Sequence, residues 1–145
     1  MEAFQVITFF IPGVSDGARS IIRIQKKEKR FEAQGTEDAD IIFVSYGVSF
    51  RIAKEAARIL QSKKLKIGLF RPISLWPFPY QALRKVSSGK KAVFAFELSY
   101  GQMLEDVRLA IGESPPIYFY GRGGGEVFTE EELTRFVISK LKIKK

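Results

Sequence analysis

The side chains that could perform chemistry in this chain are few, because its 145 residues include neither histidine nor cysteine. A histidine base, a Ser–His or Cys–His pair, a histidine-ligated metal, iron–sulfur ligation and a disulfide are therefore all excluded within it. Aspartate, glutamate, lysine and tyrosine remain for acid–base work, and the sequence places none of them in a recognisable catalytic cluster. We therefore predict that the chain turns over no substrate by itself.

Two charged residues end apolar runs and are candidates for a ligand site or an interface. Glu97 ends one run and is either a functional carboxylate or a group held by the backbone amides of the next turn. We expect the second arrangement, because buried polar groups nearly always find hydrogen-bond partners. Arg71 ends another run and could bind an anionic group, a neighbouring subunit or an internal carboxylate.

Two loops supply the other candidates. Trp76 and Phe78 lie in the proline-rich stretch RPISLWPFP, and Trp76 is either a core residue or a docking anchor, since tryptophan is enriched at interface hot spots. Arg122 and Gly123 begin the stretch RGGG, whose backbone amides could bind a phosphate. No strand–GxxxxGK[ST]–helix pattern accompanies that stretch, so we expect a flexible loop without a ligand.

The elements that must position these residues follow from the hydrophobic pattern after residue 40. Apolar runs alternate with amphipathic stretches, and the runs cover residues 41–46, 65–70, 92–98 and 117–120. Four strand–helix units in succession predict right-handed crossovers and a parallel sheet with helices on both faces. Gly47 turns the chain after the first strand, and Ser49 can cap the helix that follows.

The beginning of the chain has a different pattern. Residues 4–10 are β-branched and aromatic and predict a strand, whereas residues 17–33 predict an amphipathic helix. We therefore divide the chain into an N-terminal strand and linker helix, residues 1–35, and an α/β domain, residues 36–145, within one structural domain overall. No basic leader precedes the first apolar stretch and no run approaches ~20 apolar residues, so we expect a soluble cytoplasmic protein without a membrane partner.

The net charge of +8 introduces one alternative class of function. Lysine and arginine side chains that neutralise phosphates release counterions, so a basic nucleic-acid-binding module must be considered. The other interpretation is that the basic residues solvate helix faces or meet an acidic partner.

An ordered series of motifs in this chain resembles the C-terminal part of the 2-oxoacid:ferredoxin oxidoreductase alpha subunit, which is the second domain of the pyruvate:ferredoxin oxidoreductase core. The similarity covers about residues 19–140, and its segments are DADIIFVSYG, KIGLFRPISLWPFP, FELSYGQMLEDVRLAIG and PIYFYGRGGG. The most specific pieces are residues 71–79 and Glu97 with the following Gly101, Gln102 and Met103. The family usually has asparagine where this chain has Ser99, whose hydroxyl we expect to cap the helix that starts near Gly101.

The resemblance implies a fold similar to the transketolase C-terminal domain. That fold has three layers, α/β/α, around a mixed, mostly parallel five-stranded sheet with one antiparallel edge strand, for which residues 4–10 are our candidate. With the family's strand order, the winding reverses between residues 41–46 and 92–98. A small ligand, if one binds, is expected in the crevice near Gly47 and Glu97.

The resemblance also implies a function. The parent complex oxidatively decarboxylates a 2-oxoacid to an acyl-CoA and passes electrons to ferredoxin, with thiamine diphosphate, Mg²⁺ and iron–sulfur clusters held by other domains or subunits. The family's diphosphate site uses a Gly-Asp-Gly motif, and Ser15-Asp16-Gly17 lacks its first glycine, so we expect no cofactor in this chain.

We therefore predict a non-catalytic structural and assembly domain that is inactive alone. We expect residues 71–79 and the helix over residues 17–33 to dock onto the thiamine-binding domain, while ferredoxin is an indirect partner. An independent anion-binding module for CoA or a nucleotide, using Gly47 and the loop over residues 121–125, is the alternative. The basic nucleic-acid-binding module ranks below it.

Overall fold

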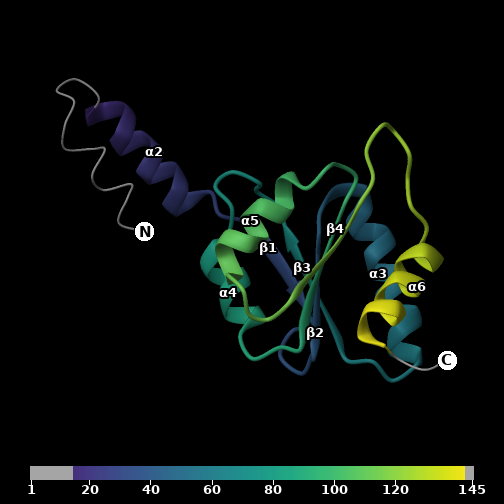
Figure 1. Cartoon of the computed structure of the whole chain (residues 1–145). Helices are drawn as coiled ribbons and strands as arrows, with labels where there is room; N and C mark the ends of the chain where they lie inside the picture. The colour runs from purple at the N-terminus through teal and green to yellow at the C-terminus, as the bar shows by residue number, and fades with distance from the viewer. Residues whose placement is uncertain (1–14, 143–145) are drawn as a thin grey trace.

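This computed structural model describes residues 15–142, which form one five-stranded sheet and five helices (Figure 1). The strands are β1 (Phe31–Gln34), β2 (Ile41–Ser45), β3 (Ile67–Pro72), β4 (Ala92–Glu97) and β5 (Ile117–Gly121). The helices are α2 (Ser15–Lys27), α3 (Gly47–Ser62), α4 (Tyr80–Ser87), α5 (Gln102–Ile111) and α6 (Glu130–Leu141). From β2 onward, strands and helices alternate as the hydrophobic pattern predicts.

The sheet has the order β1-β3-β2-β4-β5. β2 pairs in parallel with both β3 and β4, and β4 pairs in parallel with β5. β1 is antiparallel to β3, with Phe31 opposite Pro72. A mixed, mostly parallel sheet with one antiparallel edge strand is therefore confirmed.

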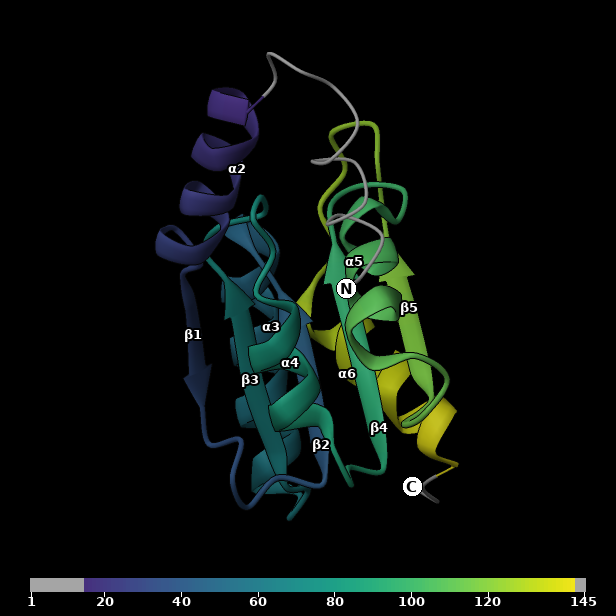
Figure 2. The same ribbon diagram turned by 90° about the vertical axis from the view of Figure 1, so that its left-hand side faces the viewer.

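Helices cover both faces of this sheet, so the three-layer α/β/α arrangement is also confirmed. α4 and α5 lie side by side on one face, and α3 and α6 cover the other (Figures 1 and 2). Because a parallel strand between two helical layers buries side chains on both faces, β2 and β4 are buried at every position.

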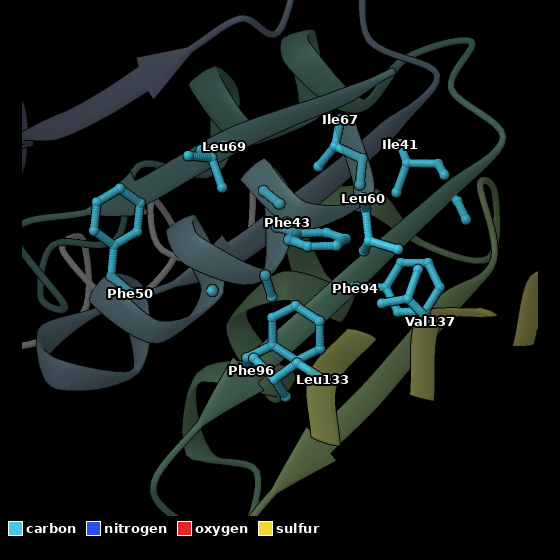
Figure 3. Close-up of a cluster of buried hydrophobic side chains, with 14 of the residues drawn as sticks. Ile41, Phe43, Phe50, Leu60, Ile67, Leu69, Phe94, Phe96, Leu133 and Val137 are labelled. Atoms are coloured by element: carbon cyan, nitrogen blue, oxygen red, sulfur yellow. The ribbon is translucent and has the colours of Figure 1, made fainter. Parts of the chain in front are cut away.

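The two cores divide the side chains of each strand between them. Beneath α3 and α6, the rings of Phe43 and Phe96 meet edge to face with centroids 4.9 Å apart. Leu60, Leu133 and Val137 close over them from the helices (Figure 3). The alternate positions enter the core beneath α4 and α5, which includes Ile42, Val44, Phe70, Leu83, Val93, Met103 and Val107. This alternation follows from the two-residue period of a strand.

The structure corrects the assignment of the edge strand. The helix expected over residues 17–33 ends at Lys27, and the antiparallel edge strand is β1. The Phe31 ring stacks on Phe70 with centroids 5.3 Å apart, so pairing with the free edge of β3 outweighs the helical pattern. Residues 4–10, our candidate for this strand, lie outside the described residues. The sheet begins at residue 31, which precedes the predicted start of the α/β domain at residue 36.

Candidate functional site

The winding of the sheet reverses between β2 and β4, as expected, because β3 and β4 lie on opposite sides of β2. Open α/β sheets bind ligands at such a reversal, beyond the carboxyl ends of the strands. The loop with Gly47 follows β2 there, and Glu97 ends β4 beside it, since Ser45 and Phe96 are directly paired. The structure therefore brings these two predicted site residues to the same edge of the sheet.

Two buried serine hydroxyls, those of Ser45 and Ser49, form hydrogen bonds at the carboxyl ends of β2 and β4. The Ser45 Oγ donates to the Phe96 carbonyl over 2.8 Å and lies 2.8 Å from the Ser49 Oγ. Ser49 is inside α3, and its hydroxyl donates to the Tyr46 carbonyl over 2.6 Å. The expectation that Ser49 caps α3 is therefore wrong, because α3 starts two residues earlier, at Gly47, where a positive φ of 59° makes the turn.

Glu97 is fully buried and holds the beginning of α5. Its Oε1 accepts hydrogen bonds from the backbone N–H groups of Gly101 at 3.1 Å and Met103 at 3.4 Å, and its Oε2 accepts from Leu104 at 2.9 Å. These N–H groups have no partner within the helix, so the carboxylate replaces the missing carbonyls. Its negative charge also interacts favourably with the positive end of the helix dipole. As expected, Glu97 is held by the turn that follows it.

The remaining residues of this turn support the same arrangement. The Ser99 hydroxyl donates to Glu97, so the expected cap from Ser99 to the helix is wrong: a carboxylate that reaches the N–H groups directly has taken that role. Gly101 has a left-handed backbone with φ of 107°, which a residue without Cβ adopts at low cost. The Gln102 Oε1 accepts from the Tyr100 N–H at 3.1 Å.

The proline-rich loop after β3 separates its two aromatic side chains. Phe78 is buried in the core beneath α4 and α5, whereas Trp76 is 62% exposed. Of the two roles weighed for Trp76, the core role is therefore wrong. Arg71, at the end of β3, lies 3.6 Å from the Glu32 carboxylate of β1 and 5.2 Å from the Phe50 ring centroid. Arg71 thus forms an ion pair with a carboxylate of the same chain.

Arg122 is also engaged within the chain. Its Nη2 donates to the Glu132 carboxylate over 2.8 Å, and the other oxygen of Glu132 accepts the Thr129 N–H at 2.7 Å in the capping box of α6. These hydrogen bonds, that of Arg122 first, lower the pKa of Glu132. An anion at this loop would compete with Glu132. Tyr100 covers Gly123, because a Cβ there would lie 2.3 Å from the ring.

A groove of about 800 Å³ between β1, β3 and α3 was not anticipated from the sequence. Its charged lining residues are Glu32, Arg51, Lys54, Glu55, Arg58 and Arg71. The Arg58 Nη2 lies 2.6 Å from the Glu55 Oε1, and the Arg71 Nη1 lies 3.6 Å from the Glu32 Oε2. Both carboxylates are therefore in ion pairs. The hydrogen bond from Arg58 lowers the pKa of Glu55. Both carboxylates of the groove are thus engaged with arginines of the same groove.

A row of exposed apolar side chains at the carboxyl edge was also missed, apart from Trp76. Val48, Ile73, Leu75, Tyr100 and Val127 each follow a parallel strand and are exposed. Their common position between the end of a parallel strand and the first turn of the next helix is the signal that could have identified them.

Within residues 15–142, no three metal-ligating side chains come together. No helix in that range combines the length and apolar character needed to cross a membrane.

The sequence comparisons agree with the geometry. The family model for the pyruvate:ferredoxin oxidoreductase core domain II matches residues 39–133. The chain is 36% identical to ketoisovalerate oxidoreductase subunit VorB of Methanothermobacter marburgensis over 77% of its length, and 34% identical to 2-oxoglutarate synthase subunit KorA of Methanocaldococcus jannaschii over 83%. It spans only about a third of these relatives, 32% and 33% respectively.

Solved structures show the same fold. The 2-oxoglutarate:ferredoxin oxidoreductase from Magnetococcus marinus, with 2-oxoglutarate, coenzyme A and succinyl-CoA bound, matches 90% of this chain with a TM-score of 0.70 and 23% identity. That match covers 24% of the larger chain. A split gene transketolase, in an inactive beta4 tetramer, matches 80% of this chain and 42% of its own with a TM-score of 0.61 and 22% identity. Since the family model matches more than half of the chain, the chain belongs to the pyruvate:ferredoxin oxidoreductase core domain II family.

Proposed function

We propose that this chain is a non-catalytic assembly domain of a 2-oxoacid:ferredoxin oxidoreductase, which converts a 2-oxoacid and CoA to an acyl-CoA and passes electrons to ferredoxin. One observation carries the proposal. Glu97, the acidic side chain at the reversal of the sheet, is buried and holds α5 by three backbone hydrogen bonds. At the position where this fold would support chemistry, the carboxylate is thus bound to backbone N–H groups of the same chain.

The other parts of the site support a role in packing. Arg71 and Arg122, the two arginines predicted from the sequence as possible anion ligands, are paired with Glu32 and Glu132. A general acid or base must reach a reacting group, and the charged candidates Arg71, Glu97 and Arg122 are each engaged with neighbouring protein groups. These pairs weigh against the alternative of an independent CoA-binding or nucleotide-binding module.

The cofactors of the proposed complex belong to its other domains. Thiamine diphosphate and Mg²⁺ do not fit here, because the Gly-Asp-Gly motif is incomplete and no cluster of metal ligands occurs within residues 15–142. Iron–sulfur clusters need cysteine ligands, which the chain lacks. The two thirds of the relatives' length that this chain does not span provide room for such sites.

The substrate is proposed at the level of its class. The relatives are named for ketoisovalerate and for 2-oxoglutarate, and both compounds are 2-oxoacids. No residue described above discriminates between their side chains. Substrate selection is therefore assigned to the domains that hold the reacting groups.

Two measurements test this proposal. Calorimetric titration of the chain with thiamine diphosphate and Mg²⁺ should show no binding, and the chain alone should not reduce a viologen dye with 2-oxoacid and CoA. The complex formed with the thiamine-binding and iron–sulfur subunits should reduce the dye. A micromolar thiamine diphosphate site on the chain, or turnover by the chain alone, would contradict the proposal.

A further inference from the structure

Exposed apolar side chains are concentrated on one side of the molecule. Among the described residues, every large exposed apolar side chain except Leu109 lies on α2, at the start of β1, or between the end of a parallel strand and the first turn of the next helix. We call the second and third groups the carboxyl-edge patch, which comprises Phe31, Val48, Ile73, Leu75, Trp76, Tyr100 and Val127. Because β1 is antiparallel, its first residue lies at the same edge as the ends of the other strands.

The patch extends across the whole width of the sheet. In the order of the strands, Phe31 belongs to β1, Trp76 follows β3, Val48 follows β2, Tyr100 follows β4 and Val127 follows β5. Exposed apolar side chains that occur singly are normal, whereas several of them at one edge of a domain favour an interaction surface.

α2 adds a second unpartnered surface. It projects beyond the sheet (Figures 1 and 2), and Ile21, Ile22 and Ile24 are each more than 40% exposed. A helix of 13 residues is marginal in water without tertiary packing. The rest of the described chain provides little packing, since the residues of α2 from Gly17 onward are exposed or half-buried. Within the described part of the chain, the isoleucines of α2 are therefore available to a partner.

Hydrogen bonds join the segment that follows α2 to the loop that contains Trp76. The Arg30 N–H donates to the Ser74 Oγ at 2.9 Å, and the Arg30 carbonyl accepts from Ile73 at 2.9 Å and Ser74 at 3.1 Å. The Ser74 hydroxyl also donates to the Pro77 carbonyl over 2.9 Å. The helix and the patch are thus attached at one point, so a single partner can contact both.

The charge next to the isoleucines indicates what that partner is. From α2 to the start of β1 the chain contains six cations, Arg19, Arg23, Lys26, Lys27, Lys29 and Arg30. Glu28 is the acidic residue between Gly17 and Arg30, and it lies 3.2 Å from Arg30. A complementary surface has an apolar groove with an acidic rim.

We propose that α2 and the carboxyl-edge patch dock together onto an acidic, apolar protein surface of the thiamine-binding part of the oxidoreductase. The proposal rests on the assembly role proposed above and names the surface that performs it. The aligned part of this chain covers about a third of each relative, so a protein surface of the required size is available in the remaining two thirds. α2 lies in a groove of the partner, and Trp76 is the central anchor of the contact.

The test uses the full chain and the thiamine-binding subunit of the same oxidoreductase, with the dissociation constant measured by calorimetry. Trp76→Ala should raise Kd by on the order of 30-fold, as for a buried aromatic hot spot. The pair Ile21→Ser with Ile24→Ser should raise Kd comparably. Leu109→Ala is the matched control, because Leu109 is 69% exposed but lies on α5 outside the patch. That control should change Kd less than about 3-fold.

A separate measurement keeps folding apart from docking. Because Trp76 is exposed, Trp76→Ala should shift the thermal midpoint by no more than about 2 °C. Arg23→Glu with Lys27→Glu should weaken binding at low salt, and the difference from the wild type should shrink as salt is added.

The outcomes separate the two proposals. If the wild-type chain does not bind the thiamine-binding subunit, the assembly role itself is wrong. If it binds, but the Trp76 and isoleucine variants bind as tightly as Leu109→Ala, the docking surface is wrong and the assembly role stands. Trp76-dependent dimerisation, sedimentation with phosphatidylglycerol vesicles, or salt-resistant binding to duplex DNA, each without subunit binding, would also overturn the docking surface.

Discussion

Replacement of Glu97 by glutamine tests whether its carboxylate is a structural cap or a functional group. The substitution keeps the size of the side chain but exchanges one acceptor oxygen for a donor NH₂. In the wild type, Oε1 accepts from Gly101 and Met103, and Oε2 accepts from Leu104. Glutamine can keep the first two hydrogen bonds at most, because its NH₂ group would face the Leu104 N–H.

The expected loss follows from these contacts. A buried donor left without a partner costs about 1–3 kcal/mol, and hydrogen bonds to a charged group contribute about 1.5–3 kcal/mol each. Leu104 is buried, so water cannot satisfy its N–H in the variant. Together with weaker bonds to the neutral oxygen, we expect Glu97→Gln to lower the free energy of unfolding by about 3 kcal/mol. A domain of ordinary stability, about 5–15 kcal/mol, remains folded after this loss.

Urea denaturation followed by circular dichroism measures this loss directly. With a slope of about 2 kcal/mol/M, the midpoint should fall by about 1.5 M. Glu105→Gln is the control, because Glu105 is an exposed carboxylate of α5 that lies 2.8 Å from Arg108. It should change stability by less than about 0.5 kcal/mol. If Glu97→Gln loses less than about 1 kcal/mol while the assembled complex loses activity, Glu97 is a functional carboxylate and our interpretation is wrong.

Three further outcomes are expected. Gly68→Ala should cost about 1–3 kcal/mol in the same urea assay, because its Cβ would lie 2.8 Å from the Thr36 Cα, whereas Gly17→Ala meets open space and should not destabilise the chain. Burial foremost, then the hydrogen bond to Asp106, raises the pKa of Tyr80 to about 12. The protonated Tyr80 hydroxyl stabilises the fold fully below about pH 10, the ordinary pKa of tyrosine, and this contribution is lost as pH rises through about 12. Tyr80→Phe should therefore remove the tyrosine ionisation near pH 12 from an ultraviolet titration. The lowered pKa of Glu132 stabilises the fold above its ordinary value of 4.5 and ceases to do so as pH falls through the lower folded value. Glu132→Gln should therefore lower the thermal midpoint at neutral pH, and this deficit should shrink as pH falls below 4.5; a deficit that does not change with pH would contradict this reasoning.

The parallel part of the sheet could be predicted because burial on both faces leaves a clear trace in the sequence. Each predicted run overlaps the strand that the structure contains, and the run over residues 41–46 exceeds β2 by one residue. The reversal between β2 and β4 came from the family resemblance, and the observed strand order confirms it.

The edge strand could not be predicted because its cause lies outside its own sequence. β1 has only four residues, FEAQ, whose side chains alternate between exposed and half-buried. Such a segment has no apolar run, and Phe31 fits the helical pattern of the preceding isoleucines equally well. The decisive interaction is long-range, because β1 pairs with β3 some forty residues later and Phe31 stacks on Phe70.

The same limit explains the mixed result for the site. Trp76 and Phe78 are two residues apart in one proline-rich loop, yet one is exposed and the other is buried. Composition and spacing are similar for both, so the sequence could not decide which residue belongs to the core. Glu97 was predictable because a carboxylate after a buried strand, followed by a glycine and a helix, has backbone N–H groups within reach.

A cluster of basic residues lies in and just after α2. α2 and the segment to Arg30 contain six cations beside three exposed isoleucines, and this segment leaves the domain at the carboxyl-edge patch. A nucleic-acid surface gains affinity from phosphate contacts and does not require a row of exposed aliphatic side chains. A protein groove with an acidic rim uses both the charges and the isoleucines. We therefore propose that the carboxyl edge of the sheet, where related architectures hold ligands, is in this domain a contact surface for another protein.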